Sequence, residues 1–150
     1  MQLINKLKKE VRPSTWMQNI LRIIMALFMI YAGYTHLTIY RNEFQALVPE
    51  WVGLEKDLVV VTSGIVEILL ALAFLFWQKR RKQIGWALAI FLILVFFGNV
   101  NQYLREIDAF GLTTDRARLI RLWFQPILVV WALWSSGNLS RSIEAQKPNY

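Results

Sequence analysis

Glu67 is the residue whose position most directly suggests chemistry, because it stands alone in a long apolar stretch. Residues 59–77 contain no other charged side chain, and the stretch is about as long as a helix that crosses a bilayer. An ionised carboxylate in a lipid core costs at least about 2.5–3.5 kcal/mol. We therefore expect Glu67 to face other helices or water, where it is paired or carries a proton.

Five other polar side chains stand in apolar stretches at a comparable depth: His36, Ser63, Asn99, Arg121 and Gln125. With a rise of about 1.5 Å per residue, helices place all of them between the bilayer midplane and the external surface. Ser63, Gly64 and Glu67 lie on one helix face of small and polar residues, which allows a neighbouring helix to approach closely. Together these side chains predict one polar pocket that opens outward.

A purely structural reading remains open for several of these residues. Polar side chains in membrane proteins often only bridge helices, contributing about 0.6 kcal/mol on average, and for Asn99 and Gln125 taken singly we favour that reading. Arg121 lies near the external end of its helix, where its guanidinium can also extend to the interface. Asn101 is about 200° around the helix from Asn99, so only one of the two can face the pocket.

Four apolar segments must position these side chains: 20–40, 58–77, 84–104 and 119–136. Each is close to the roughly 20 residues that a membrane-spanning helix requires. The chain is 56% hydrophobic and has 7 Trp and 9 Phe, which exceeds the usual content of a soluble domain. We predict an all-α fold, an integral membrane antiparallel four-helix bundle that forms a single four-span domain over residues 1–150.

The charges predict the orientation of this bundle. An even number of crossings puts both termini on one side, and four consecutive basic residues in the linker 78–83 mark that side as cytoplasmic. No small-residue cleavage pattern follows the segment 20–40, so we expect it to be retained and not to act as a signal peptide. We also expect almost no polar groups inside the cytoplasmic half of the bundle.

The external loop 41–57 is too apolar for a freely solvated linker. Pro49 and Gly53 divide it, which favours a short interfacial or re-entrant helical turn over one long helix. Such a loop is suited to act as a lid over the pocket.

Several function classes are not supported by the composition. Without cysteine the chain has no disulfide, thiolate metal site or thiol redox couple. Its net charge of +7 comes from basic residues at the ends of apolar segments, which are topology signals and do not indicate nucleic acid. A lone His36 predicts no metal site, and no nucleophile–base pair or phosphate loop is visible, so we assign no stand-alone catalytic activity and no catalytic residue.

Five short motifs follow one another along the chain: Ala32-Gly33-Tyr34-Thr35-His36, Val48-Pro49, Gly64 with Glu67, Gly98-Asn99, and Arg121 with Gln125. In order and spacing they resemble the DoxX-like family of small four-helix bacterial membrane proteins. The resemblance covers nearly all of the four segments and selects Asn99 over Asn101. The chain departs from it at Leu37, where the family often has Phe, at Phe97-Gly98, where it has Pro-Ala, and at Trp123, where it has Pro.

The resemblance implies a bacterial inner-membrane protein, and family members include a quinone-reducing oxidoreductase subunit and a partner in thiol-stress complexes. Our first hypothesis is a subunit of a membrane redox system whose pocket binds a quinone or similarly amphipathic small molecule. His36, Arg121 and Gln125 would donate hydrogen bonds to its oxygens, Glu67 would carry a proton, and a partner protein would supply electrons. The alternatives are an assembly factor, chaperone or scaffold with a purely structural polar cluster, and, last, a small transporter that acts as a homodimer.

Overall fold

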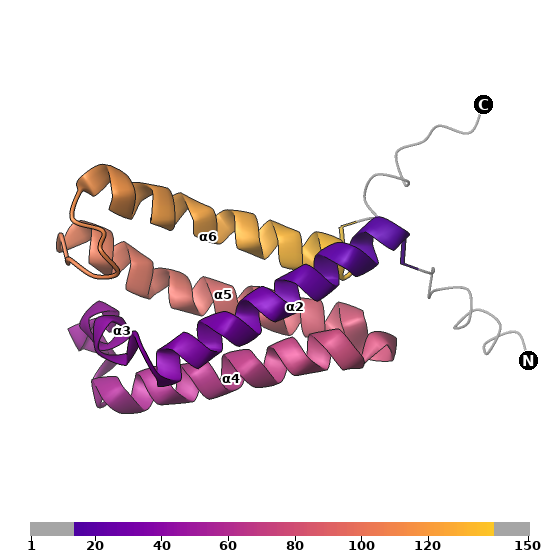
Figure 1. Cartoon of the computed structure of the whole chain (residues 1–150), viewed down its shortest axis with the longest axis horizontal. Coiled ribbons are helices and arrows are strands. Elements are labelled where there is room, and N and C mark those ends of the chain that lie inside the picture. The colour runs from indigo at the N-terminus through magenta and orange to yellow at the C-terminus, as the bar shows by residue number, and fades with distance from the viewer. Residues whose placement is uncertain (1–13, 140–150) are drawn as a thin grey trace, which may run out of the picture.

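The computed structural model of the chain describes residues 14–139, among which five α-helices dominate and no strand occurs. In chain order the helices are α2 (Trp16–Leu37), α3 (Arg41–Leu47), α4 (Lys56–Phe76), α5 (Arg81–Leu104) and α6 (Asp115–Ser135), with two 3-10 turns, η1 (Glu50–Val52) and η2 (Gln78–Arg80) (Figure 1). The predicted all-α class is confirmed for this part of the chain.

Four of the helices are long and apolar enough to cross a membrane: α2, α4, α5 together with η2, and α6. They match the four predicted segments, although α2 begins at Trp16 and α6 at Asp115, each four residues before the expected start. At α2 the reason is a capping box, in which the Thr15 hydroxyl accepts a hydrogen bond from the Gln18 amide and the Gln18 side chain accepts one from the Thr15 amide. At α6 the Thr114 hydroxyl caps the helix by accepting from the Ala117 amide. A four-span multi-pass protein is compatible with this architecture.

The long helices associate mainly as two close pairs, α2 with α4 and α5 with α6. Glycines set the distance in each pair. A Cβ added to Gly33 would lie 2.8 Å from the Gly64 carbonyl oxygen, and one added to Gly85 would lie 2.3 Å from the Ser136 side chain. The small-residue face predicted around Gly64 is therefore the contact surface between α2 and α4.

The apolar core occupies the half of the molecule where α2 begins and α6 ends. It consists of buried side chains from all four long helices: Met25, Met29, Ala71, Phe74, Ile84, Leu88, Leu92, Leu128 and Ala132. Toward the opposite end α4 and α5 diverge (Figure 1). The helices therefore close around a packed core at one end and around a wider space at the other.

The expectation of almost no polar groups in the core half is wrong. Arg22 is buried, and its guanidinium donates hydrogen bonds to the carbonyl oxygens of Phe74 and Leu75 at the end of α4. Those carbonyls have no amide partner within the helix, and a cation there interacts favourably with the helix dipole. Gln18 is also buried and donates to the Trp134 carbonyl oxygen, 3.2 Å away.

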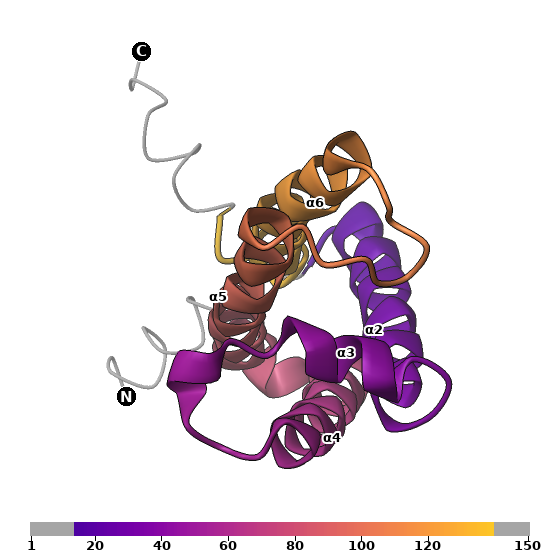
Figure 2. The ribbon, with the colours of Figure 1, turned by 90° about the vertical axis from the view of Figure 1, so that its left-hand side faces the viewer.

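The segment 41–57 forms the short helix α3 and the turn η1, as the positions of Pro49 and Gly53 predict. Seen from its end, the molecule shows α3 lying across the space between the long helices (Figure 2). The loop 105–114 crosses the same end between α5 and α6. We call α3 together with this loop the cap.

Residues 1–13 and 140–150 lie outside the described part of the chain, and so do the predicted cytoplasmic termini and the ends of the predicted domain 1–150. Within the described residues, the start of α2 and the end of α6 lie at the same end of the molecule (Figure 1).

Candidate functional site

A cavity of about 1100 Å³ lies beneath the cap, between the α2–α4 pair and the α5–α6 pair. Most of its lining side chains are apolar. The six polar residues singled out in the sequence all line it: His36, Ser63, Glu67, Asn99, Arg121 and Gln125. Residues from four helices that are far apart in the sequence therefore share one space.

His36 and Glu67 form a buried pair on one wall of the cavity. The Nδ1 atom of His36 lies 3.0 Å from Glu67 Oε2 and also 3.0 Å from the Ala32 carbonyl oxygen. A single proton on Nδ1 can point at only one of these acceptors. Among the described residues Glu67 Oε2 has no other partner, so its pairing depends on His36 alone.

The glycine contact between α2 and α4 brings this pair together. His36 stands three residues after Gly33, and Glu67 stands three residues after Gly64, so each polar side chain is one turn from the point of closest approach. A Cβ at Gly64 would lie 2.8 Å from the His36 Cβ. The absence of that Cβ is what allows the imidazole to reach the carboxylate.

A chain of amide hydrogen bonds crosses the opposite wall. Arg121 Nε donates to Asn99 Oδ1 at 3.2 Å, Asn99 Nδ2 donates to Gln125 Oε1 at 3.1 Å, and Gln125 Nε2 donates to the Leu92 carbonyl oxygen at 3.0 Å. Asn99 and Gln125 thus join α5 to α6 and orient the arginine. This agrees with the bridging role favoured for these two amides.

Arg121 does not extend outward to the interface. Its Cζ atom lies 3.9 Å from the centre of the Phe110 ring and 5.9 Å from that of Phe44, both within cation–π range. Only its Nε atom has a hydrogen-bond partner among the described residues. The two terminal nitrogens, which can bind two oxygens of one planar group, have none there.

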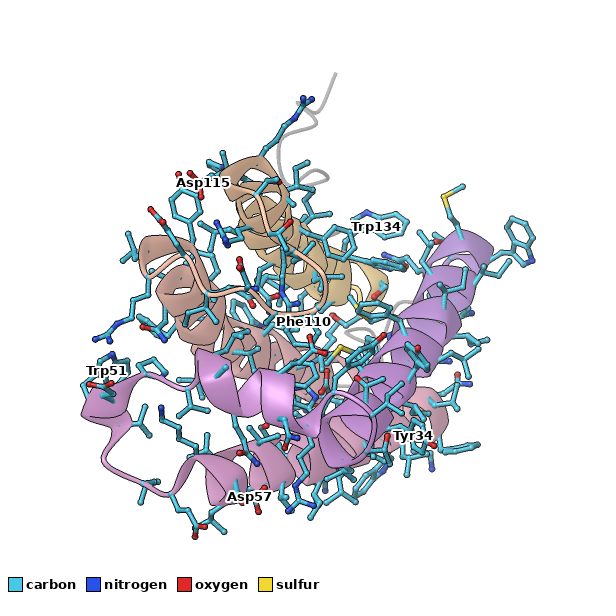
Figure 3. The ribbon with its side chains drawn as sticks, turned by 60° about the vertical axis from the view of Figure 1, so that its left-hand side comes forward. Tyr34, Trp51, Asp57, Phe110, Asp115 and Trp134 are labelled. Carbon is cyan, nitrogen blue, oxygen red and sulfur yellow. The ribbon has the colours of Figure 1, made fainter. Side chains whose placement is uncertain are left out.

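Two aromatic residues of the cap, which the sequence did not single out as site residues, complete the cavity. The Phe44 ring stacks on His36 with the ring centres 3.6 Å apart, and Phe110 meets Phe44 edge-on at 4.7 Å. Phe110 lies near the middle of this end of the molecule (Figure 3). Its φ of 57° is in the left-handed region, which bulky residues rarely adopt, and its amide donates to the Glu43 carboxylate.

Polar contacts fasten the cap to the long helices. Arg41 donates to both carboxylate oxygens of Asp57, at 2.6 and 2.5 Å, and this bond raises the pKa of Arg41 above its usual value. Asn101 Nδ2 donates to the Leu47 carbonyl oxygen at 3.1 Å. Asn101 therefore holds the cap and does not line the cavity, which leaves Asn99 as the cavity residue, as the resemblance selects.

Ser63 lines the cavity, although its hydroxyl donates to the Val60 carbonyl oxygen in its own helix at 2.8 Å. Between residues 14 and 139, no group of three or more His, Cys, Asp or Glu side chains is placed to hold a metal ion. The polar side chains offer hydrogen bonding and proton exchange, from His36 and Glu67 on one wall and from Arg121 on the other.

Residues 25–136, which include every cavity residue discussed above, match a family model described as Domain of unknown function (DUF8561). No curated protein and no solved structure matches the chain.

Proposed function

The chain belongs to the DUF8561 family, and we propose that it is a multi-pass membrane protein whose cavity binds a quinone or a similarly amphipathic small molecule. In this proposal the four long helices form an antiparallel bundle across the bacterial inner membrane, with the cap at the external side. The order and spacing of the motifs that resemble the DoxX-like family support this location.

The proposal rests mainly on the terminal nitrogens of the Arg121 guanidinium, which face the cavity without a hydrogen-bond acceptor among the described residues. The guanidinium lies inside a mostly apolar cavity, held by Asn99 and Phe110. An apolar cavity with a few convergent polar groups is the usual form of a small-molecule site. A carbonyl or other oxygen of a ligand would satisfy these donors.

His36 offers the second contact for such a ligand. Its Nδ1 faces Glu67, and no described residue pairs with its Nε2. His36 stacks on the Phe44 ring, and the Arg121 Cζ atom lies 5.9 Å from the centre of the same ring, so both groups adjoin one aromatic side chain. A flat ring that bears oxygens at its edges, as a quinone does, suits two donors arranged in this way.

The His36–Glu67 pair would exchange a proton with the bound head of the ligand. Reduction of a quinone takes up two protons and two electrons, and the chain has no thiol that could supply the electrons. In our proposal His36 is an imidazolium paired with the Glu67 carboxylate. It gives its Nε2 proton to one quinone oxygen and keeps its Nδ1 proton, water supplies the second proton, and a partner redox protein supplies the two electrons. Asn99 and Gln125, whose hydrogen bonds are made within the fold, position Arg121 and do not bind the ligand directly.

The alternative of a scaffold with a purely structural polar cluster explains Asn99 and Gln125, which satisfy each other. It gives no role to the cation that lines the cavity, whose terminal nitrogens have no hydrogen-bond acceptor among the described residues.

The test is a titration of the purified protein with a tail-free quinone analogue, followed by tryptophan fluorescence or calorimetry. We expect saturable binding that Arg121→Gln weakens by roughly tenfold or more, since a hydrogen bond from a charged donor contributes about 1.5–3 kcal/mol. Arg116→Gln, which changes an exposed arginine of the same helix, is the matched control and should bind as the wild type does. Absence of saturable binding, or equal affinity of Arg121→Gln and wild type, would refute the proposal.

A further inference from the structure

The cavity reaches the molecular surface along the line where α4 and α5 diverge. Strongly exposed apolar side chains line it at three places. Leu58 (55%) and Val66 (37%) on α4 and Leu94 (63%) on α5 stand along the gap between these two helices. The others stand on α2 and α6 (Phe28, Ile120 and Phe124) and at the cap end (Trp51, Leu54 and Phe97). A side chain that both lines a cavity and faces the outside marks an opening. We call the gap between Leu58, Val66 and Leu94 the seam.

The seam exists because the contacts that hold α4 against α5 are at its far end. Ala71 and Phe74 of α4 pack with Ile84 and Leu88 of α5 in the apolar core, next to the turn η2. Toward the cap the two helices separate (Figure 1). Gly98 faces the cavity there, and a Cβ at that position would find its nearest neighbour 3.7 Å away, in Leu47.

Side chains or backbone contacts close the other sides of the cavity. Gly33 against Gly64 closes the gap between α2 and α4, and Asn99 bonded to Gln125 closes that between α5 and α6. Between α2 and α6, the rings of Phe28 and Phe124 meet edge-on at 6.4 Å.

The cap closes the end of the cavity. Arg41 holds α3 to Asp57 on α4, and Leu47 holds it to Asn101 on α5. At the cap end of the seam, Trp51 of η1 meets Phe97 of α5 edge-on at 6.1 Å. Along the rest of the seam, no hydrogen bond, ion pair or ring contact of the described residues joins α4 to α5.

We propose that the seam is a lateral doorway occupied by the hydrocarbon tail of the ligand, an isoprenoid or acyl chain that runs from the cavity into the bilayer. This inference rests on the proposed function, which supplies the polar head. The exposed surface of the seam is apolar at Leu58, Val66 and Leu94 and carries one hydroxyl, that of Thr62, so hydrocarbon can lie along most of it. A cavity of about 1100 Å³ slightly exceeds the range of roughly 300–1,000 Å³ for small-molecule sites, which leaves room beyond a single ring for the first part of a chain.

The experiment compares two probes that share one head: a benzoquinone without a tail and the same benzoquinone with a short isoprenoid tail. Both are titrated into wild-type protein and into Val66→Trp, which places a large ring at the rim of the seam. We expect Val66→Trp to weaken binding of the tailed probe by roughly tenfold or more, as overfilling a packed site does, and to leave the tail-free probe unaffected. Leu69→Trp is the matched control, because Leu69 is an exposed α4 residue that does not line the cavity.

A photoreactive group at the end of the tail gives a second readout that does not depend on the folding of a variant. In wild-type protein we expect it to label peptides of α4 and α5. Labelling of α2 and α6 instead, or an equal effect of Val66→Trp on both probes, would overturn the doorway while leaving the proposed head site intact. If wild-type protein binds neither probe, the proposed function fails and this inference fails with it.

Discussion

At the scale of single residues, the chemistry of the cavity depends on which oxygen receives the proton on His36 Nδ1. Ala32 and Glu67 each present an acceptor at 3.0 Å, and Glu67 Oε2 has no alternative partner among the described residues. A buried carboxylate that loses its partner is strongly destabilising, whereas a neutral amide of the same shape tolerates the loss better. The pair should therefore show strong energetic coupling.

A double-mutant cycle measures this coupling. We expect His36→Ala to lower the free energy of unfolding by about 3–5 kcal/mol, because it leaves the buried Glu67 unpaired. In the Glu67→Gln background the same change should cost clearly less, since no carboxylate remains to be stranded. The measurement is unfolding in mixed micelles with increasing SDS, followed by circular dichroism. Equal costs in both backgrounds would show that the pair is not coupled.

At the scale of helices, the approach of α2 to α4 determines whether this pair can form. Gly33 and Gly64 are the points of contact, and His36 and Glu67 follow each of them by one turn. Gly98 on α5 is different, since an added Cβ would meet only ordinary van der Waals contacts at 3.7 and 3.8 Å. The two glycines Gly64 and Gly98 therefore form a matched test of the packing argument.

Gly64→Ala should destabilise the protein by about 1–3 kcal/mol, because the new methyl would lie 2.8 Å from the His36 Cβ and 3.0 Å from the Gly33 carbonyl oxygen. It should also weaken binding of the tail-free quinone analogue, since it displaces His36. Gly98→Ala should not lower the stability, because the added methyl has room and alanine favours the helix more than glycine does. The readouts are the thermal midpoint in detergent and the binding titration, and a Gly98→Ala variant that loses as much stability as Gly64→Ala would contradict this reading.

The sequence predicts the features of the fold and the site that depend on neighbouring residues, and it does not predict those that depend on contacts between distant segments. The four long helices follow from apolar runs of sufficient length, and the isolated charge of Glu67 follows from the same runs. The place of Phe110 does not, because it needs a backbone with φ of 57° and a bond to Glu43, 67 residues earlier in the chain. Arg22 was missed because its partners are backbone carbonyls at the end of another helix, which leave no mark in the sequence.

At the scale of the whole molecule, one end holds the packed core and the other holds the cavity and its cap. In the proposed membrane orientation, this division places the site for the ligand's head near the external surface and the seam beside the lipid. The basic turn around η2 lies at the core end, and the distribution of charge predicts that this end is cytoplasmic.

Introduced cysteines test this orientation without background, because the chain has none of its own. Thr113→Cys, in the cap, should react with a membrane-impermeant maleimide in intact spheroplasts, which expose the outer face of the inner membrane. Gln83→Cys, near the start of α5, should react only after the membrane is permeabilised. Both residues are exposed, so labelling reports the side of the membrane and not burial. The reverse pattern would place the cap and the cavity in the cytoplasmic half.

The central claim is that the cavity holds a small amphipathic molecule through Arg121, and native mass spectrometry of protein extracted directly from its membrane tests it most directly. We expect wild-type protein and the Arg116→Gln control to carry one mass adduct that fragments as a quinone or a similar tailed ring, and the Arg121→Gln variant to lack it. Wild-type protein that carries only the phospholipids of the bulk membrane, or an adduct that Arg121→Gln retains in full, would contradict the account.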